Sequence, residues 1–189
     1  MSIEKGDATK YVHTGNGELC YELNKALTVP ETFPIYLSSA YIFDSIDPID
    51  KICDEGAPGY AYFRLGNPNA DATSQILAAG EGGEKGLVFS SGMAAITATL
   101  SSLLHSGGHV LALRSAYHPV IGFLDTEMKK YGVEVTYLER FTPEEIERSL
   151  RPNTRVFYLE SPSSNIFRVL PLREIAAQAH ACGAVTVID

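Results

Sequence analysis

Beyond Asn67-Pro68 the chain alternates short apolar runs with amphipathic stretches, and this alternation limits the fold more than any other feature. It is typical of parallel strands joined by helices, with helices covering both faces of the sheet. We therefore predict an α/β domain with a mostly parallel sheet sandwiched by helices. The apolar runs predict strands at residues 87–89, 110–113, 133–138, 155–159 and 184–188.

The stretches between these runs carry helix signals. Apolar residues follow Pro119 at three- and four-residue spacing as far as Gly132, which predicts a helix between the second and third strands. The segment Thr142-Pro143-Glu144-Glu145 forms a capping box, with Thr at the N-cap and Glu three residues later, and predicts a helix through residue 150. A last helix is predicted over residues 172–179.

Residues 1–58 differ from the rest of the chain, because four prolines interrupt them and their helical periodicity is poor. We predict an extended N-terminal arm over residues 1–58 and a large α/β domain that begins at residue 59.

Composition and charge exclude several functions. The 189 residues are 45% hydrophobic, which is enough to bury a core. Fifteen basic residues against 23 acidic ones give a net charge of −8, which disfavours nucleic acid and anionic membranes as partners and leaves a small molecule. The N-terminus lacks the apolar core of a signal peptide, so we expect a cytoplasmic protein. The three cysteines form no paired motif, so no metal site is predicted.

A Ser90-Ser91-Gly92 turn lies between the first apolar run and an amphipathic segment that predicts a helix from Gly92 to Leu104. The first amides of such a helix lack intrahelical partners and lie at the positive end of its dipole, so the turn can bind an anion. Ser91 could equally be an ordinary N-cap. The local sequence leaves both interpretations open.

Polar residues also follow three of the other predicted strands. They are Tyr117, Glu160 with Ser164, and Asp189. Ligands of open parallel sheets bind at the carboxyl ends of the strands, so these side chains outline one site together with the Ser-Ser-Gly turn. An anion seat, an aromatic ring and a carboxylate suit a phosphorylated pyridine cofactor, whose ring nitrogen a carboxylate keeps protonated.

Several short motifs together resemble the Cys/Met-metabolism family of pyridoxal-phosphate (PLP) enzymes, from about Pro34 to Asp189. They are Tyr62-Phe63-Arg64-Leu65-Gly66-Asn67-Pro68, Ser90-Ser91-Gly92-Met93-Ala94-Ala95, Tyr117, Glu160-Ser161-Pro162 and Val187-Ile188-Asp189. The resemblance implies the large domain of fold-type I PLP-dependent transferases, with PLP as cofactor. Residues 59–189 would be the first part of that PLP-binding domain.

The resemblance also implies roles for individual residues. The amides of Gly92 and Met93 would hold the cofactor phosphate, Tyr117 would stack on the ring, and Asp189 would pair with its nitrogen. Ser91, Glu160 and Ser164 are also expected among the cofactor-binding residues. Tyr62 and Arg64 would reach the phosphate of a neighbouring subunit, which implies a homo-oligomer, a dimer of shared sites that forms a tetramer.

The motifs depart from the family pattern in places that bear on the reaction. Phe63 replaces a serine, and Ser164 stands where many members have asparagine. Ser164, Tyr117 and Pro119 look more like the cystathionine β-lyase branch, so we expect β-elimination of cystathionine or cysteine to thiol, pyruvate and ammonia. The alternative is γ-elimination or γ-replacement, as in methionine γ-lyase, cystathionine γ-synthase or lyase and O-acetylhomoserine sulfhydrylase.

In the family, the lysine that forms a Schiff base with the cofactor lies well beyond the aspartate that pairs with the ring. The seven lysines of this chain all precede Asp189 and lack that motif. We expect these residues to be the N-terminal part of a carbon–sulfur lyase, inactive alone. The alternative is a half-length paralogue that serves as a binding or assembly module without catalysis.

Overall fold

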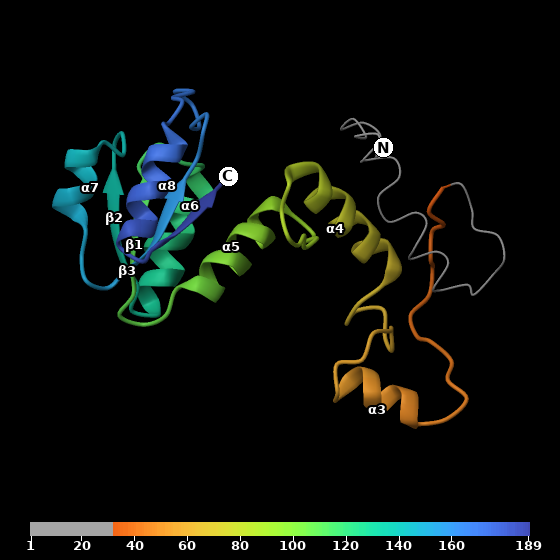
Figure 1. The fold of residues 1–189 in the computed structure, drawn as a ribbon. Helices are drawn as coiled ribbons and strands as arrows, with labels where there is room; N and C mark the ends of the chain where they lie inside the picture. Colours follow the sequence, from red (N-terminus) through yellow and green to blue (C-terminus); the bar gives the residue numbers. More distant parts are fainter. Residues whose placement is uncertain (1–31) are drawn as a thin grey trace. The chain divides into compact units, whose positions relative to one another are not determined.

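The structure, a computed structural model, describes residues 32–189, which form two units, residues 32–88 and 89–189 (Figure 1). Residues 1–31, the first part of the predicted arm, lie outside the described residues.

The first unit contains two helices, α3 (Asp47–Cys53) and α4 (Pro68–Glu81). The predicted arm is therefore not extended throughout, because α3 forms within it. A proline in the first turn starts each helix, where its missing N–H costs no hydrogen bond. The side chain of Asn67 caps α4 by accepting a hydrogen bond from the amide of Ala70 at 2.9 Å.

Side chains of α4 hold the preceding chain. The amide of Tyr36 donates to Oδ1 of Asn69 at 3.0 Å, and Nδ2 of Asn69 donates to the carbonyl oxygen of Tyr36 at 2.8 Å. The ring of Tyr41 stacks on that of Tyr60 with centroids 5.8 Å apart, and the Tyr60 hydroxyl donates to Asp71 at 2.6 Å. The chain before α4 is thus attached to the first turn of this helix.

The second unit is built on a parallel sheet in the order β2-β1-β3-β4. Its strands are β1 (His109–Leu113), β2 (Glu134–Leu138), β3 (Thr154–Leu159) and β4 (Val185–Ile188). Each of these four strands was predicted with ends within one residue of those observed. The structure therefore confirms the predicted α/β class.

The helices of the second unit lie on both faces of this sheet. They are α5 (Gly92–Leu103), α6 (His118–Phe123), the π-helix η1 (Leu124–Met128), α7 (Pro143–Ser149) and α8 (Leu172–Ala181). The connection from β1 to β2 runs in one direction along the sheet, and the connections from β2 to β3 and from β3 to β4 run in the other. Because such crossovers are right-handed, α6 lies on one face of the sheet and α7 and α8 lie on the other.

The capping box at the start of α7 forms only in part. The hydroxyl of Thr142 accepts from the amide of Glu145 at 3.3 Å, as predicted. The carboxylate of Glu145, however, accepts from the amide of Arg140 at 2.9 Å. It thus supports the turn that precedes the cap.

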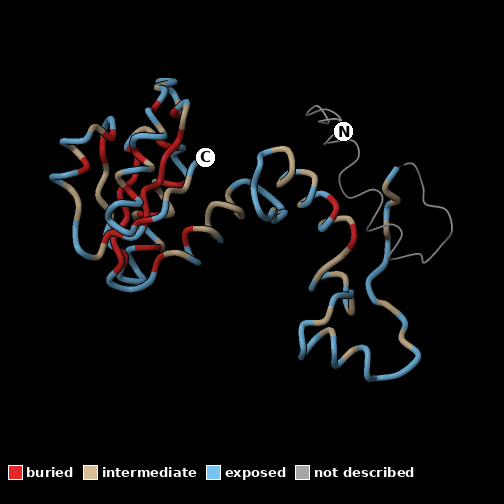
Figure 2. The backbone as a smooth tube through the Cα atoms, in the orientation of Figure 1, coloured by how far each residue is buried: buried red, intermediate tan, exposed pale blue. Residues whose placement is uncertain are grey.

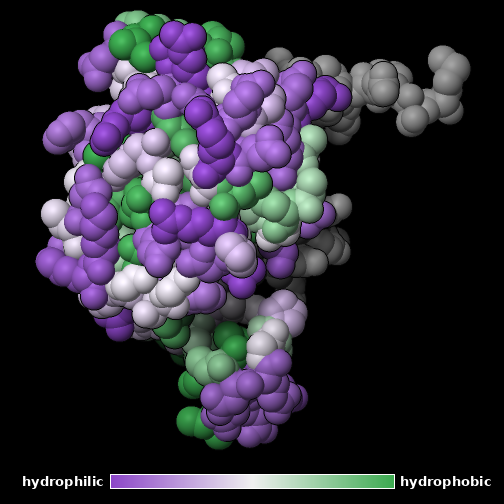
Figure 3. All heavy atoms as spheres, turned by 90° about the vertical axis from the view of Figure 1, so that its left-hand side faces the viewer, coloured by the Kyte–Doolittle hydropathy of each residue, from purple (hydrophilic) through white to green (hydrophobic). Residues whose placement is uncertain are grey.

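The core lies around β1 and β3, which are the two inner strands. All five residues of β1 are buried, and Val156, Phe157 and Tyr158 of β3 are fully buried. Figure 2 shows the buried residues gathered in this unit. The face that carries α7 and β2 is mainly hydrophilic, with scattered apolar side chains (Figure 3).

The prediction of a buried strand at residues 87–89 was wrong. Leu87 is 80% exposed and Phe89 is 39% exposed, and neither lies in a strand. A strand needs a neighbour for its backbone hydrogen bonds, and no strand among residues 32–189 pairs with this segment. Among the described residues the sheet ends at β4, where Val185 and Ile188 are also about half exposed.

A buried histidine joins three strands at the amino ends of the sheet. Nδ1 of His109 lies 2.8 Å from Oγ1 of Thr154 on β3, and its Nε2 lies 2.9 Å from Oγ1 of Thr136 on β2. Beside it Arg151 makes an ion pair with Glu134. The pKa of His109 is lowered from 6.5 to about 4, mainly because the ring is buried and also because of the nearby Arg151 guanidinium, while the Glu134 carboxylate acts in the opposite direction.

This lowered pKa predicts loss of stability in mild acid. The unfolded chain binds a proton at His109 near pH 6.5, but the folded chain does so only near pH 4. The stabilisation is therefore present above pH 6.5 and is lost as the pH falls from 6.5 through 4, by up to about 3 kcal/mol.

Urea unfolding of the full-length protein between pH 7.5 and 4 measures this loss. We expect the pH dependence to be smaller in His109→Gln than in the wild type, because glutamine does not titrate there. His105→Gln, at an exposed histidine, is the control and should keep the wild-type pH dependence. Equal slopes for His109→Gln and the wild type would contradict the prediction.

Candidate functional site

At the amino end of α5, two backbone donors have no recorded partner among residues 32–189. Oγ of Ser91 accepts from the amide of Ala94 at 3.1 Å, and the Ser91 carbonyl accepts from that of Ala95 at 3.1 Å. The structure records no hydrogen-bond partner for the amides of Gly92 and Met93 among the described residues. Ser91 is thus the predicted N-cap, and two donors at the positive end of a helical dipole remain for an anion.

The space beside Gly92 is open. A Cβ added at Gly92 would meet no atom within 4 Å. The Ser91 hydroxyl can still donate its own proton while it accepts from Ala94. This donor set fits a phosphate group.

Tyr117 is held by a buried carboxylate. It follows β1 and immediately precedes α6, and its amide donates to Oε2 of Glu160 at 2.6 Å. Glu160 follows β3 and is only 7% exposed, whereas the Tyr117 side chain is about half exposed. Glu160 therefore anchors the backbone of Tyr117 and leaves the aromatic ring accessible.

Asp189 follows β4 and is anchored to β3. Its amide donates to the carbonyl oxygen of Leu159 at 3.0 Å, which continues the pairing of these two strands. Its Oδ2 accepts a hydrogen bond from the hydroxyl of Tyr158 at 3.3 Å. Tyr158 is fully buried, while Asp189 is exposed.

The sheet therefore brings together three of the predicted strand ends. The register pairs Ala112 with Tyr158 and Leu159 with Ile188, so β1, β3 and β4 end side by side. Tyr117, Glu160 and Asp189 lie at this edge. The structure records no hydrogen bond between them and the amino end of α5 among the described residues.

Ser164 lies in the loop after β3. The neighbouring serines stabilise this loop, because Oγ of Ser161 accepts from the amide of Leu170 at 3.0 Å and Oγ of Ser163 accepts from that of Arg168 at 3.2 Å. The carbonyl oxygen of Ser164 accepts from a nearby amide, while its hydroxyl has no recorded partner among the described residues.

Tyr62 and Arg64 lie in the first unit, so their position relative to the sheet is not described. The Arg64 guanidinium lies over the Tyr62 ring, 5.1 Å from its centroid. Tyr62 is 40% exposed and pairs with Ala40 in an isolated antiparallel bridge. The two predicted phosphate-binding side chains are thus in contact with each other.

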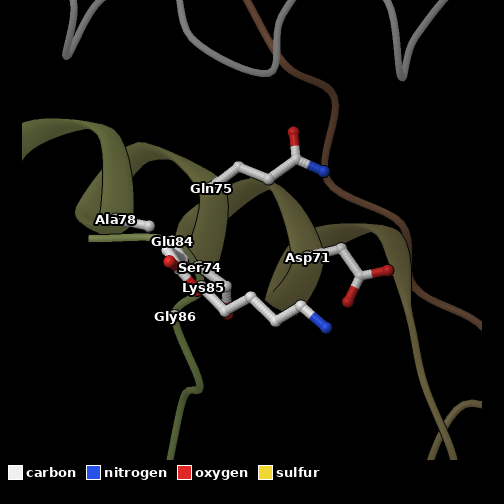
Figure 4. Close-up of a pocket in the computed structure, with 7 residues that line it drawn as sticks. All are labelled: Asp71, Ser74, Gln75, Ala78, Glu84, Lys85 and Gly86. Carbon is white, nitrogen blue, oxygen red and sulfur yellow. The ribbon is translucent and has the colours of Figure 1, made fainter. Parts of the chain in front are cut away.

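The structure records no hydrogen bond or ion pair between the four described lysines and Tyr117, Glu160 or Asp189. Lys129 and Lys130 make surface ion pairs with Asp125 and Glu127. Lys85 lines a cavity of about 200 Å³ between α4 and the turn that follows it, where Figure 4 shows its side chain extended along the helix. This turn is the glycine-rich segment before Leu87. A Cβ at Gly86 would lie 2.4 Å from the carbonyl oxygen of Ser74, so the close contact with α4 requires glycine.

Sequence reasoning missed two residues near the site. Tyr158 contacts Asp189, and Oγ of Ser115, just after β1, is buried without a partner among the described residues. Tyr158 precedes Glu160 by two residues, so both point to the same side of the strand, and this spacing could have identified it. An unpaired buried hydroxyl such as that of Ser115 is expected where a ligand or water binds.

Comparisons with known proteins identify a family, similar sequences and a similar fold. The model of a family described as Cys/Met metabolism PLP-dependent enzyme matches residues 8–189. An L-methionine gamma-lyase of Fusobacterium nucleatum is 36% identical over 78% of this chain and 37% of its own length. An L-methionine gamma-lyase of Porphyromonas gingivalis is 33% identical over 98% of this chain and 45% of its own length.

A solved structure has the same fold. A putative O-acetylhomoserine (thiol)-lyase (metY) of Campylobacter jejuni, which carries N'-pyridoxyl-lysine-5'-monophosphate, matches with a TM-score of 0.87 and 25% identity. The match covers 98% of this chain and 44% of that protein. This chain therefore spans less than half the length of these relatives.

None of the helices formed by residues 32–189 is both long and apolar enough to cross a bilayer.

The contact between Glu160 and Tyr117 predicts a local effect of substitution. Glu160→Ala leaves the Tyr117 amide without its charged acceptor and should destabilise the full-length protein by about 2 kcal/mol. Glu160→Gln keeps an acceptor oxygen and should lose less. Urea unfolding measures the loss, and hydrogen exchange of a peptide covering residues 114–118 should speed up in the same order.

Glu139→Ala is the matched control. Glu139 is an exposed carboxylate just after β2, and its ion pair with Arg114 is long, at 4.0 Å. The loss there should stay within about 0.5 kcal/mol. Equal losses at residues 139 and 160 would argue against a specific anchor.

Proposed function

Because the chain belongs to the Cys/Met metabolism family of PLP-dependent enzymes, we propose that the full-length protein eliminates or replaces the γ-substituent of a sulfur amino acid. The observation that carries the proposal is the edge of the sheet where β1, β3 and β4 end. It combines an accessible tyrosine ring, an anchored carboxylate and, in the same unit, a helix terminus with unpaired amides.

The choice of γ- over β-chemistry rests on the relatives. The two similar lyases are named L-methionine gamma-lyase, and the similar structure is titled as an O-acetylhomoserine (thiol)-lyase. These names support the alternative more than the β-elimination that the pattern around Tyr117 and Ser164 favours. A few residues near the site are a weaker guide to the reaction than similarity along the whole chain.

The residues of this chain hold the cofactor in the proposal. The amides of Gly92 and Met93 and the hydroxyl of Ser91 bind the phosphate, and the Tyr117 ring stacks on the pyridine. The carboxylate of Asp189 keeps the pyridine nitrogen protonated. The bound cofactor supplies an electron-withdrawing ring that stabilises negative charge on the substrate.

Glu160 and Ser164 act at the same edge in different ways. Glu160 fixes the backbone of Tyr117 and hence the point from which its ring extends. The Ser164 hydroxyl has no recorded protein partner among the described residues and can bind the cofactor or the substrate. Residues 59–189 are in this proposal the first part of the cofactor-binding domain, preceded by the arm.

Tyr62 and Arg64 complete the site of a second subunit in the proposal. Their mutual contact orients the guanidinium, and a planar guanidinium binds a phosphate through two hydrogen bonds. The functional unit is therefore a dimer with shared sites, which can assemble further into a tetramer.

The products of cystathionine cleavage separate the two reactions. We expect the full-length protein with PLP to release 2-oxobutyrate, cysteine and ammonia from cystathionine, and to release 2-oxobutyrate and methanethiol from methionine. A β-elimination would give pyruvate and homocysteine from cystathionine. Chromatography of the oxo acids measures the ratio, and pyruvate as the main product would reject γ-elimination.

Mixing two inactive variants tests the shared site. Arg64→Ala and Asp189→Ala should each lose activity, but a mixed dimer has one site with both defects and one with neither. After refolding together in equal amounts, we expect about one quarter of wild-type activity. Variants refolded separately and then combined without subunit exchange are the control. No recovery in the mixed dimers would show that Arg64 and Asp189 of the same subunit serve the same site, and would contradict the sharing.

A further inference from the structure

Tyr158 is a fully buried tyrosine whose hydroxyl contacts an exposed carboxylate. Its ring belongs to the core around β3, and only its hydroxyl reaches the edge of the sheet. There the hydroxyl lies 3.3 Å from Oδ2 of Asp189. The core thus fixes the donor, while the acceptor lies on the adjacent edge strand.

We infer that Tyr158 is a positioning residue that holds the carboxylate of Asp189 in the orientation needed to pair with the pyridine nitrogen. The inference rests on the proposed function, because it deepens the role proposed there for Asp189. Nothing in the motif pattern assigns a role to this tyrosine.

The geometry explains why Asp189 needs such a partner. Its backbone is fixed by the hydrogen bond from its amide to the Leu159 carbonyl, but its side chain can rotate about two torsion angles unless a partner restrains it. The hydrogen bond from Tyr158 restrains Oδ2. Oδ1 has no recorded partner among the described residues and remains free to accept from a ligand. A group restrained before binding loses less entropy when the ligand arrives.

The electrostatic surroundings keep the tyrosine a donor. Burial raises the pKa of the Tyr158 hydroxyl well above its usual value of 10, and the nearby carboxylates of Asp189 and Glu160 raise it further. The phenol therefore keeps its proton over the whole physiological range. It can donate to Asp189 whether or not the cofactor is bound.

A double-mutant cycle on cofactor affinity tests the inference. The probe is pyridoxamine 5′-phosphate, which carries the ring and phosphate of PLP but no aldehyde, so its Kd reports only non-covalent contacts. The variants of the full-length protein are Tyr158→Phe, Asp189→Ala and the double variant. Tyr158→Phe should weaken binding about five- to twentyfold, since one hydrogen bond to a charged group is lost.

The coupling between the two residues is the decisive readout. In the Asp189→Ala background, Tyr158→Phe should leave the Kd unchanged, because there is no carboxylate left to position. Tyr137→Phe is the matched control, since it removes a hydroxyl on β2 that lies 3.5 Å from the Ile121 carbonyl, away from Asp189. It should leave the Kd unchanged in both backgrounds.

Two outcomes would overturn the inference without touching the proposed function. One is an equal effect of Tyr158→Phe with and without the Asp189 carboxylate, which would indicate a merely structural role. The other is no effect in either background. A wild-type protein that does not bind pyridoxamine 5′-phosphate would instead refute the proposed function, and the inference with it.

A second variant keeps the test valid if Tyr158→Phe does not fold, which urea unfolding detects. Asp189→Glu leaves the core intact but moves the carboxylate by one methylene away from the position that Tyr158 holds. We expect it to weaken binding nearly as much as Asp189→Ala. A wild-type Kd for Asp189→Glu would show that the position of the carboxylate does not matter.

Discussion

The parallel pairing of β1 with β2 on one side and β3 on the other is the constraint on which the rest of the second unit depends. Since every strand runs in the same direction, all their carboxyl ends lie at one edge. Glu160 and Asp189 directly follow β3 and β4, and Tyr117 comes four residues after the end of β1, so residues far apart in the sequence lie at this edge. The buried apolar residues of β1 and β3 fix this order, and the polar residues of the site need only follow the strands.

The two ends of the sheet use buried polar groups in different ways. At the amino ends His109 hydrogen-bonds to threonines of both neighbouring strands, so its polar atoms are satisfied within the protein. At the carboxyl ends Glu160 accepts a hydrogen bond from the Tyr117 amide, and Tyr158 donates one to Asp189. Each bond holds a residue whose side chain is accessible to a ligand. The arrangement at the amino ends uses up the hydrogen-bonding groups of the histidine ring, whereas the arrangement at the carboxyl ends leaves groups available for a ligand. Substitutions at the two ends should therefore affect stability and binding to different degrees.

Sequence patterns predicted the four strands well because each is a short, mainly apolar run. The run at Leu87–Phe89 has the same pattern but no partner among the described residues, and a strand is a property of a pair. Patterns also identified Tyr117, Glu160 and Asp189 as candidate site residues, but not the hydrogen bonds that hold Tyr117 and Asp189 in place. The partners of Tyr117 and Asp189 lie 43 and 31 residues away, and Tyr158 looks like any core aromatic residue. Only the register of the sheet reveals these pairs.

The two outer strands of the sheet have opposite surface chemistry. β2 begins with Glu134, whose ion pair with Arg151 puts charge along that side, and α7 packs against this strand. β4 carries Val185 and Ile188, and along its outer side no strand among residues 32–189 occupies the backbone groups. Charge discourages the addition of a strand, whereas an apolar edge with free backbone groups accepts one. The charged pair therefore disfavours an added strand beside β2, whereas a strand added beside β4 would lie next to Asp189.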